Sequence, residues 1–172
     1  MPGPLEKLSG GDRRSIGKSN EVVADILREP GLFDALFTGM VDDDPIVRMR
    51  AADAIEKITA RSPELLQPYK KTLLQKIAAI EQQEVRWHAA QMLPRLELTP
   101  SEMSKAVEIL RGYLADKSNI VKTCAMQAFA DLAERDHRFR CETINLLRES
   151  IQKGSPAMKS RGEKLLERLE AS

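Results

Sequence analysis

The segment Asp44-Pro45-Ile46-Val47-Arg48 contains an apolar residue followed by a basic one, and this pair returns three more times along the chain. The later copies are Val85-Arg86, Val121-Lys122 and Met158-Lys159. Successive apolar members are 38, 36 and 37 residues apart. A nearly constant spacing of this size is typical of repeat proteins, in which each repeat is one supersecondary unit. We call the four apolar members the anchors.

Residues at fixed distances from the anchors repeat as well. The fourth position after each anchor is small, and the eighth and eleventh positions are apolar: Ala51, Ala89, Ala125, Gly162; Ile55, Leu93, Phe129, Leu166; Ile58, Leu96, Leu132, Leu169. Positions 0, 4, 8 and 11 lie on one stripe of an α-helix. A leucine stands eleven residues before each anchor, at Leu36, Leu74, Leu110 and Leu147. Each unit is therefore predicted to be two amphipathic helices, A then B, near residues 30–60, 63–97, 100–134 and 138–170.

The turns carry residues that start and stop helices. Asp44-Pro45 and Ser155-Pro156 each place a capping side chain before a proline at the first helical position. Thr99-Pro100-Ser101-Glu102 does the same and adds the glutamate of a capping box. Pro94 lies late in the second B helix and is predicted to end or kink it early.

A helical pair with this period, small residues in helix B and the corner Asp44–Arg48 resembles the HEAT-repeat family and its armadillo-like kin. The resemblance covers residues 30–170 as about four repeats, and it implies an all-α fold wound as a right-handed α-α superhelix, or solenoid. Residues 1–11 are expected to form a flexible N-terminal tail, and residues 12–172 a single repeat domain. Ile16, Val23 and Leu27 indicate an N-terminal helix that caps the array.

Composition limits the classes of function. The 172 residues carry 27 Lys and Arg against 26 Asp and Glu, and a net charge of +1 excludes the strongly basic chain of a nucleic-acid coat protein. Cys124 and Cys141 show neither a metal-binding spacing nor a disulfide framework, so no metal and no cofactor are expected. The first residues lack the basic and apolar regions of a signal peptide. No uncharged run approaches the roughly 20 residues that span a bilayer, so a cytoplasmic protein without membrane contact is expected.

The chain contains one motif that looks catalytic or nucleotide-binding, and it fails on inspection. Gly11–Ser19 resembles a phosphate-binding loop, but five residues separate its glycines where the motif needs four, and no apolar strand precedes it. His88 and His137 are the only histidines and lie 49 residues apart. His88 follows Glu84 by one helical turn, yet no nucleophile is indicated nearby. The sequence predicts a non-enzymatic protein with no catalytic residues.

Other positions of the B helices are expected to face outward, on the surface that is concave in HEAT-like arrays. At the second and sixth positions after three of the anchors stand Met49 and Asp53, Trp87 and Gln91, and Thr123 and Gln127. Trp87 is the only tryptophan, and tryptophan is enriched among the residues that anchor interfaces. The alternative is that Trp87 packs inside, against a neighbouring helix or the Pro94 kink.

Basic residues form two further rows. Those at the third and tenth positions would give a cationic edge beside Trp87: Arg50, Lys57, His88, Arg95, Arg161 and Arg168. In HEAT-like proteins, the basic residue that follows each anchor commonly pairs with an acidic residue in a turn, which forms a ladder between repeats. Asp42, Asp43, Asp44, Glu81 and Asp116 are placed for such pairing. The alternative is a cationic track for phosphates or acidic peptides.

These observations favour a binding scaffold that holds a protein or peptide partner on its concave face. The expected partner-binding residues are Trp87, Met49, Asp53, Gln91, Thr123, Gln127, Arg50, Arg86 and Arg95. The alternative is a nucleic-acid-binding protein, because some HEAT-like proteins are similar to alkylpurine DNA glycosylases, which excise damaged bases with aromatic residues and an aspartate. Trp87 and Asp53 would take those roles. The resemblance also admits small maturation factors similar to phycobilin lyases, for which the sequence indicates no pocket.

Overall fold

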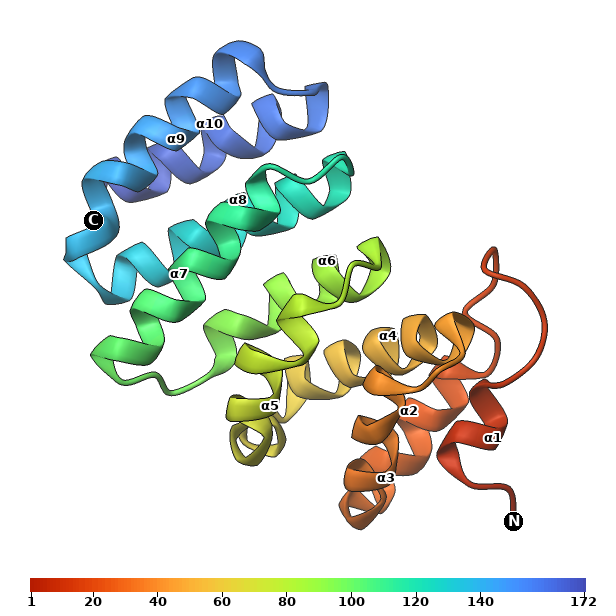
Figure 1. Ribbon diagram of the computed structural model, residues 1–172. Coiled ribbons are helices and arrows are strands. Elements are labelled where there is room, and N and C mark those ends of the chain that lie inside the picture. Colours follow the sequence, from red (N-terminus) through yellow and green to blue (C-terminus); the bar gives the residue numbers. More distant parts are fainter. The chain divides into compact units, whose positions relative to one another are not determined.

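The computed structural model describes residues 1–172 and is all-helical, with no strand (Figure 1). The α-helices are α1 (Pro4–Leu8), α2 (Ser19–Arg28), α3 (Phe33–Thr38), α4 (Pro45–Arg61), α5 (Lys70–Gln75), α6 (Gln83–Met92), α7 (Pro100–Leu114), α8 (Asn119–Arg135), α9 (Arg140–Lys153) and α10 (Pro156–Glu170). Short 3₁₀ helices are η1 (Pro30–Leu32), η2 (Gly39–Val41), η3 (Pro63–Tyr69), η4 (Ile77–Ala79), η5 (Leu93–Arg95) and η6 (His137–Phe139). None of these helices has the length and apolar character that crossing a membrane requires.

The helices begin and end where the turn residues predicted. The Asp44 carboxylate accepts a hydrogen bond from the backbone N–H of Ile46 at the start of α4, and Ser155 caps α10 in the same way. Thr99 and Glu102 form the predicted capping box of α7. Helix α6 stops at Met92 and continues only as η5, because Pro94 cannot extend an α-helix.

The chain divides into two compact units, Met1–Leu96 (unit 1) and Glu97–Ser172 (unit 2). In unit 2, α8 packs against α7, α9 and α10, and α9 and α10 run side by side (Figure 1). Gly162 is the small residue that the repeat predicted at a close approach. A Cβ atom there would lie 3.1 Å from Cγ1 of Ile151 and 3.4 Å from Cε of Met126. A larger residue would therefore push α10 away from its neighbours.

In unit 1, α4 is the central helix, in contact with α1, α2, α3 and α6. Its anchor stripe forms the core, since Ala51, Ile55 and Ile58 are fully buried. At Gly39 a Cβ atom would lie 2.6 Å from Cδ2 of Leu5 and 2.9 Å from Cβ of Ala51. Because Gly39 has no side chain, α1 and α4 can both pack closely against η2.

The expected flexible tail over residues 1–11 is wrong. Residues 4–8 form α1, and the Leu8 side chain is completely buried. The Lys7 ammonium lies 2.7 Å from Glu21 and 2.5 Å from Asp25, so ion pairs join α1 to α2. A helix of five residues is too short to show a periodic pattern, and only its packing on α4 reveals it. The expected N-terminal helix is α2, whereas Ile16 lies exposed in the loop before it.

Candidate functional site

Met49 and Arg50, two of the residues expected on the binding face, lie in the interior of unit 1. Their exposed fractions are 7% and 3%. Segments that have no counterpart in the other repeats, α1 and the loop of residues 9–18, pack on this side of α4. Met49 and Arg50 therefore cannot meet a partner at the surface of this fold, and their assignment to the binding face is wrong.

The Arg50 guanidinium is held by four backbone carbonyls. Its Nη1 donates to the carbonyls of Leu8 and Gly10, at 2.8 and 2.6 Å. Its Nη2 donates to Asp12 at 3.2 Å, and its Nε donates to Ser15 at 3.0 Å. Hydrogen bonds of this number and kind allow a charged side chain to be buried.

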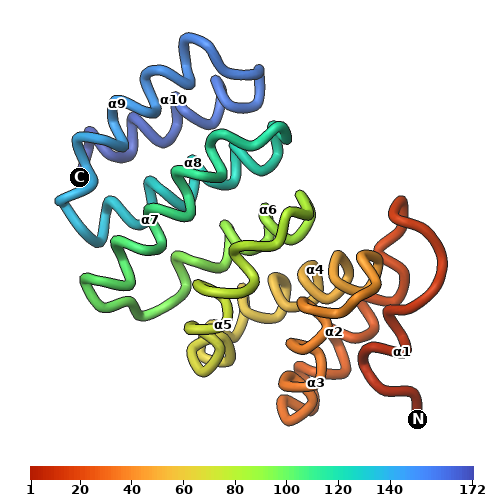
Figure 2. The backbone as a smooth tube through the Cα atoms, in the orientation of Figure 1, coloured from red at the N-terminus to blue at the C-terminus, as the bar shows by residue number.

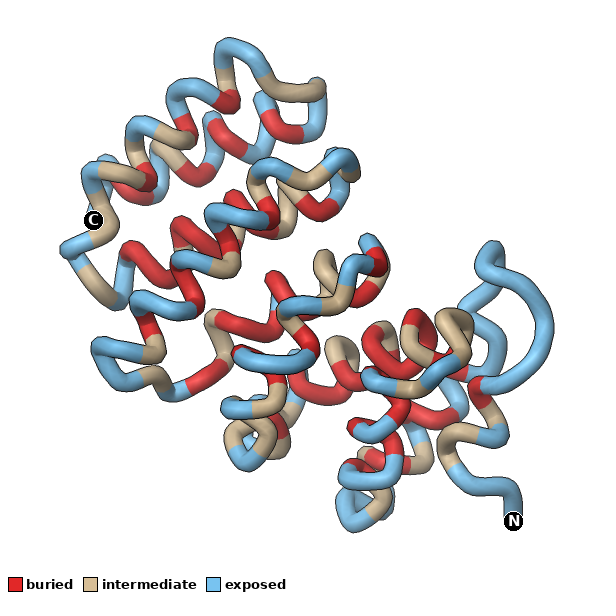
Figure 3. The backbone as a smooth tube through the Cα atoms, viewed as in Figure 1, coloured by how far each residue is buried: buried red, intermediate tan, exposed pale blue.

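The loop of residues 9–18 is shaped to wrap this guanidinium, and Figures 2 and 3 show it as an extended, exposed excursion between α1 and α2. Gly10, Gly11 and Gly17 have positive φ angles of 77°, 81° and 55°. A Cβ atom on Gly17 would lie 2.8 Å from the guanidinium carbon. The loop that resembled a phosphate-binding motif thus directs carbonyl oxygens at a cation, which is the opposite polarity to a phosphate cradle.

On the faces of α4 and α6 the expected site residues form a bonded polar cluster. Asp53 Oδ2 accepts hydrogen bonds from Ser19 Oγ at 2.5 Å and from Lys57 Nζ at 2.7 Å. His88 Nε2 lies 4.0 Å from Asp53 Oδ1, and its Nδ1 lies 3.1 Å from Gln91 Oε1. Burial lowers the pKa of His88, against the opposing effect of Asp53 and the carboxylate of Glu56. The serine donates to the carboxylate and not to the imidazole, so this cluster does not form a nucleophile–base pair.

The Arg95 guanidinium is bound by groups within unit 1. Its Nη2 lies 2.5 Å from Glu56 Oε1, and its Nη1 donates to the Glu56 carbonyl and to Thr59 Oγ1 at 2.7 and 2.8 Å. Arg86 Nε donates to the carbonyl of Ile80 at 3.1 Å. These arginines fix neighbouring backbone and side chains, and Glu56 compensates the charge of Arg95.

The exposure of Trp87 is intermediate between the two predictions, an outward-facing indole and one packed inside. Its side chain is half-buried, and its ring meets the His88 imidazole edge-on, with centroids 5.7 Å apart and an interplanar angle of 65°. Gln91, one turn further along α6, is exposed. The remaining expected residues, Thr123 and Gln127, belong to α8 in unit 2. Gln127 accepts a hydrogen bond from Arg161 Nη1 at 2.8 Å.

The predicted ladder of basic and acidic side chains is not formed at Arg48. Arg48 donates to the backbone carbonyls of Asp42 and Asp43 and, through Nε, to Gln82 Oε1 at 2.9 Å. The Gln82 amide donates in turn to the carbonyl of Pro45 at 2.8 Å. The acidic side chains in the turns are therefore not the partners of Arg48.

A regular pairing of polar side chains instead joins consecutive B helices within each unit. The tenth residue after one anchor contacts acids of the preceding B helix: Arg95 with Glu56 in unit 1, and Arg168 with Asp131 and Glu134 in unit 2, the latter two at 2.7 Å. The third residue contacts the sixth of the preceding helix, as in His88–Asp53 and Arg161–Gln127. Four members of the basic stripe that the sequence suggested as a groove edge, His88, Arg95, Arg161 and Arg168, therefore form contacts between B helices.

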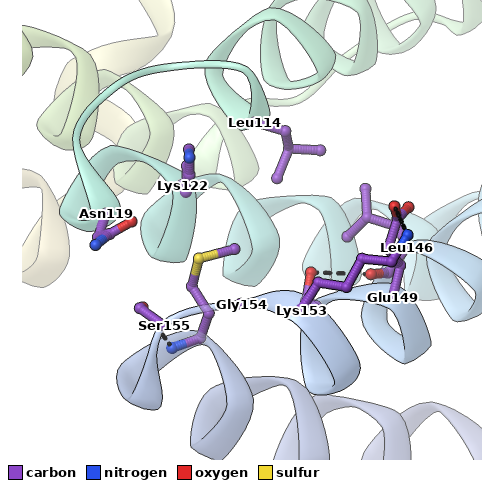
Figure 4. A pocket seen from close by; sticks show the side chains of 10 residues that line it. Leu114, Asn119, Lys122, Leu146, Glu149, Lys153, Gly154 and Ser155 are labelled. Atoms are coloured by element: carbon purple, nitrogen blue, oxygen red, sulfur yellow. Dashed lines mark hydrogen bonds and ion pairs between the residues drawn. The ribbon is translucent and has the colours of Figure 1, made fainter.

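Unit 2 contains a groove that the sequence did not indicate (Figure 4). Its volume is about 440 Å³. Leu114 from α7, Lys122 from α8 and Leu146 from α9 surround the same opening. We call it the Lys122 groove, and its lining residues are Leu114, Asn119, Lys122, Leu146, Glu149, Ser150, Lys153, Gly154, Ser155 and Met158. Leu114 belongs to none of the repeating columns, so the periodic pattern gave no reason to place it beside Lys122.

Comparison with known proteins shows a similar fold and no family. No family model matches the chain, and no curated protein matches it. A crystal structure of an engineered protein, a target of the Northeast Structural Genomics Consortium, is similar with a TM-score of 0.68 and 17% sequence identity. The similarity covers 98% of this chain and 78% of the engineered one. At this identity the likeness concerns the helical fold alone.

Proposed function

We propose that this chain is a binding scaffold without catalytic activity, built as a short right-handed solenoid of four HEAT-like helical pairs with α1 and α2 covering its first B helix. The four pairs follow one another at a nearly constant spacing. The same pairing of the third and tenth positions joins α4 to α6 and α8 to α10. Stacked helical pairs of this kind provide extended surfaces for protein partners.

The observation that carries the proposal is the surroundings of Trp87. Two charged groups predicted to share its face are bound within the chain, Asp53 by Ser19 and Lys57, and Arg95 by Glu56. The indole is half-buried and supported by His88, while Gln91 beside it is exposed. A partner would therefore meet a fixed aromatic surface among neutralised polar groups, a composition typical of interface centres. We call Trp87 and Gln91 the Trp87 face.

The test is the affinity of a partner isolated with the chain as bait, identified, purified and titrated against variants. Trp87→Ala is expected to weaken binding by about 30-fold or more, the effect of a hot-spot residue of about 2 kcal/mol. Val41→Ala is the matched control, because Val41 is a large apolar residue of unit 1 that is 49% exposed outside the Trp87 face. Circular dichroism would establish that both variants stay folded.

Two results would contradict the proposal. One is an unchanged affinity for Trp87→Ala in a folded protein, which would assign the indole to the core. The other is loss of all captured material on nuclease treatment, which would make nucleic acid the ligand. Because Trp87 is the only tryptophan, its fluorescence gives a direct second measurement of whether a partner reaches the Trp87 face.

A further inference from the structure

We infer that unit 2 carries a second binding site, independent of the Trp87 face: the Lys122 groove takes a peptide segment in which an aliphatic side chain stands next to an aspartate or glutamate. The inference rests on the shape of the groove, its apolar floor and one cation that the chain leaves without a partner. Each of these is a property of unit 2 alone.

The apolar part of the lining, which we call the floor of the groove, is three side chains from separate helices. Leu114 ends α7, Leu146 lies in α9, and Met158 lies in the first turn of α10. Leu114 and Leu146 are half-buried, so part of each side chain is exposed towards the opening in Figure 4. A volume of about 440 Å³ lies within the range of about 300–1,000 Å³ that ligand pockets occupy. Apolar surface of this kind is stabilised when an aliphatic side chain displaces water from it.

Most polar groups of the lining are satisfied within the chain, but the side chains of Asn119 and Lys122 are not. Ser150 donates to the carbonyl of Leu146 at 2.9 Å, and Ser155 accepts the backbone N–H of Met158 at 3.3 Å. Lys153 lies 3.4 Å from Glu149. Of the two lysines in the lining, only Lys122 has an ammonium that makes no hydrogen bond or ion pair within the chain. The ligand group that complements it is an anion.

The anion is best supplied by a single carboxylate. The lining holds two lysines and one glutamate, which gives an excess of one positive charge. The Lys153–Glu149 pair is largely exposed and contributes little energy of its own, so Glu149 stays available to repel a ligand with several negative charges. A polyphosphate or nucleic-acid strand would bring such charges, whereas a peptide with one carboxylate beside an aliphatic residue matches both the cation and the floor.

The experiment titrates the full ¹⁵N-labelled chain with acetyl-Gly-Ser-Leu-Asp-Ser-Gly-amide and follows backbone amide shifts by NMR. The blocked ends leave the aspartate as the only charge of the peptide. We expect the shifts to concentrate on residues 114–122 and 146–158. A peptide with Asp→Asn and another with Leu→Ser are each expected to bind more weakly, and neither comparison alters the protein.

The matched protein variants are Lys122→Glu in α8 and Lys164→Glu in α10, which reverse the charge at each position. Lys164 is exposed and lies outside the groove. Lys122→Glu is expected to weaken binding of the aspartate peptide roughly three- to tenfold, and Lys164→Glu to leave it unchanged. Raising the salt concentration is expected to reduce the difference between the aspartate and asparagine peptides.

Several outcomes would overturn the inference. They are an absence of shifts around the groove, equal binding of the aspartate and asparagine peptides, and equal effects of the two lysine reversals. A peptide that instead perturbs Trp87 fluorescence and the amides of α6 would place the binding on the Trp87 face. That result would contradict the groove while leaving the proposed function standing, so the two proposals fail separately.

Discussion

At the scale of single residues, the Arg50 side chain donates hydrogen bonds to four backbone carbonyls, and the loop of residues 9–18 depends on it. Arg50→Ala removes bonds to four carbonyls and is expected to lower the free energy of unfolding by about 2–4 kcal/mol. Urea unfolding followed by circular dichroism measures this change. Arg148→Ala is the control, because that arginine forms only an exposed pair with Glu170. Equal losses for the two variants would contradict the role given to Arg50.

A substitution at Gly17 tests whether the loop is shaped around the Arg50 guanidinium. Gly17→Ala is expected to cost about 1–2 kcal/mol for its left-handed backbone, and more for the collision of the new methyl group with the guanidinium. In an Arg50→Ala background the collision disappears, so the added cost of Gly17→Ala should be smaller. A double-mutant cycle measured by urea unfolding gives this coupling. Strictly additive costs would show that the loop is not shaped around Arg50.

His88 links stability to pH. Burial lowers its pKa in the folded protein, while Asp53 and Glu56 act to raise it and Lys57 to lower it. Above the ordinary histidine pKa of about 6.5 the imidazole is neutral in both states, and the stability is complete. As the pH falls through about 6.5, the unfolded chain binds a proton that the folded chain resists, so the free energy of unfolding decreases. His88→Gln should make the free energy of unfolding depend less on pH in this range, as measured by urea unfolding at several pH values. An unchanged dependence would contradict the role given to His88. The exposed His137 supplies the control His137→Gln.

At the scale of helices, the repeat predicted the B helices α4, α6, α8 and α10 but not what covers them. The second and third residues after the anchors are buried in α4 (Met49, Arg50), half-buried in α6 and α8, and exposed in α10. A periodic pattern assigns one exposure to all four helices. The difference arises because α1, α2 and the loop of residues 9–18, which are not periodic, pack on α4. Trp87 was placed correctly on its helix, and only the neighbouring segments decide how far it is exposed.

The first helices of the pairs show the same dependence on local chemistry. In unit 2 they are the continuous helices α7 and α9. In unit 1 they break into short pieces, η1–α3–η2 and η3–α5–η4. Pro30, Pro63 and Pro68 lie in these broken stretches, where proline removes a backbone donor. The leucine column predicted a helix in each place, and the prolines explain why the α-helical parts are short.

Gln82 is an unusual helix start. Its side chain does not cap α6 but binds Arg48 and the carbonyl of Pro45. Gln82→Ala is therefore expected to lower the free energy of unfolding by about 1.5–3 kcal/mol, because the lost bonds include one to a charged group. Gln83→Ala, at the exposed neighbouring position, should change it by no more than about 0.5 kcal/mol. Chemical denaturation measures the free energy of unfolding of both variants. Equally small losses for Gln82→Ala and Gln83→Ala would show that Gln82 does not join α4 to α6.

The two tenth-position arginines form a matched pair with different burial. The Arg95 side chain is 20% exposed and that of Arg168 is 40% exposed. Arg95→Ala leaves Glu56 and Thr59 without their donor in a half-buried place, at a cost of about 1.5–3 kcal/mol. Arg168→Ala should cost at most about 1 kcal/mol, since water replaces the arginine at the surface. Equal costs in urea unfolding would mean that burial does not govern this pairing.

At the scale of the whole molecule, the charge balance sets the solubility. The chain has a net charge of +1 at pH 7 and a sequence pI near 7.8. Repulsion between molecules is weakest where the net charge approaches zero. The protein is therefore expected to be least soluble near pH 8 and more soluble near pH 6, as measured by precipitation with polyethylene glycol at low salt. A minimum far from pH 8 would indicate a bound ion or an altered set of charges.

The buried Arg50 also sets a timetable for the synthesis of the chain. Its four acceptors precede it by 35 to 42 residues. At about 5–20 residues per second, a ribosome adds Arg50 roughly 2–8 s after it has added those acceptors. During that interval the loop of residues 9–18 has no guanidinium to bind. The loop is therefore synthesised early but takes its final conformation only after Arg50 has been added. A nascent chain halted before Arg50 emerges should be cleaved by proteases within residues 9–18, and one halted beyond α4 should be protected there.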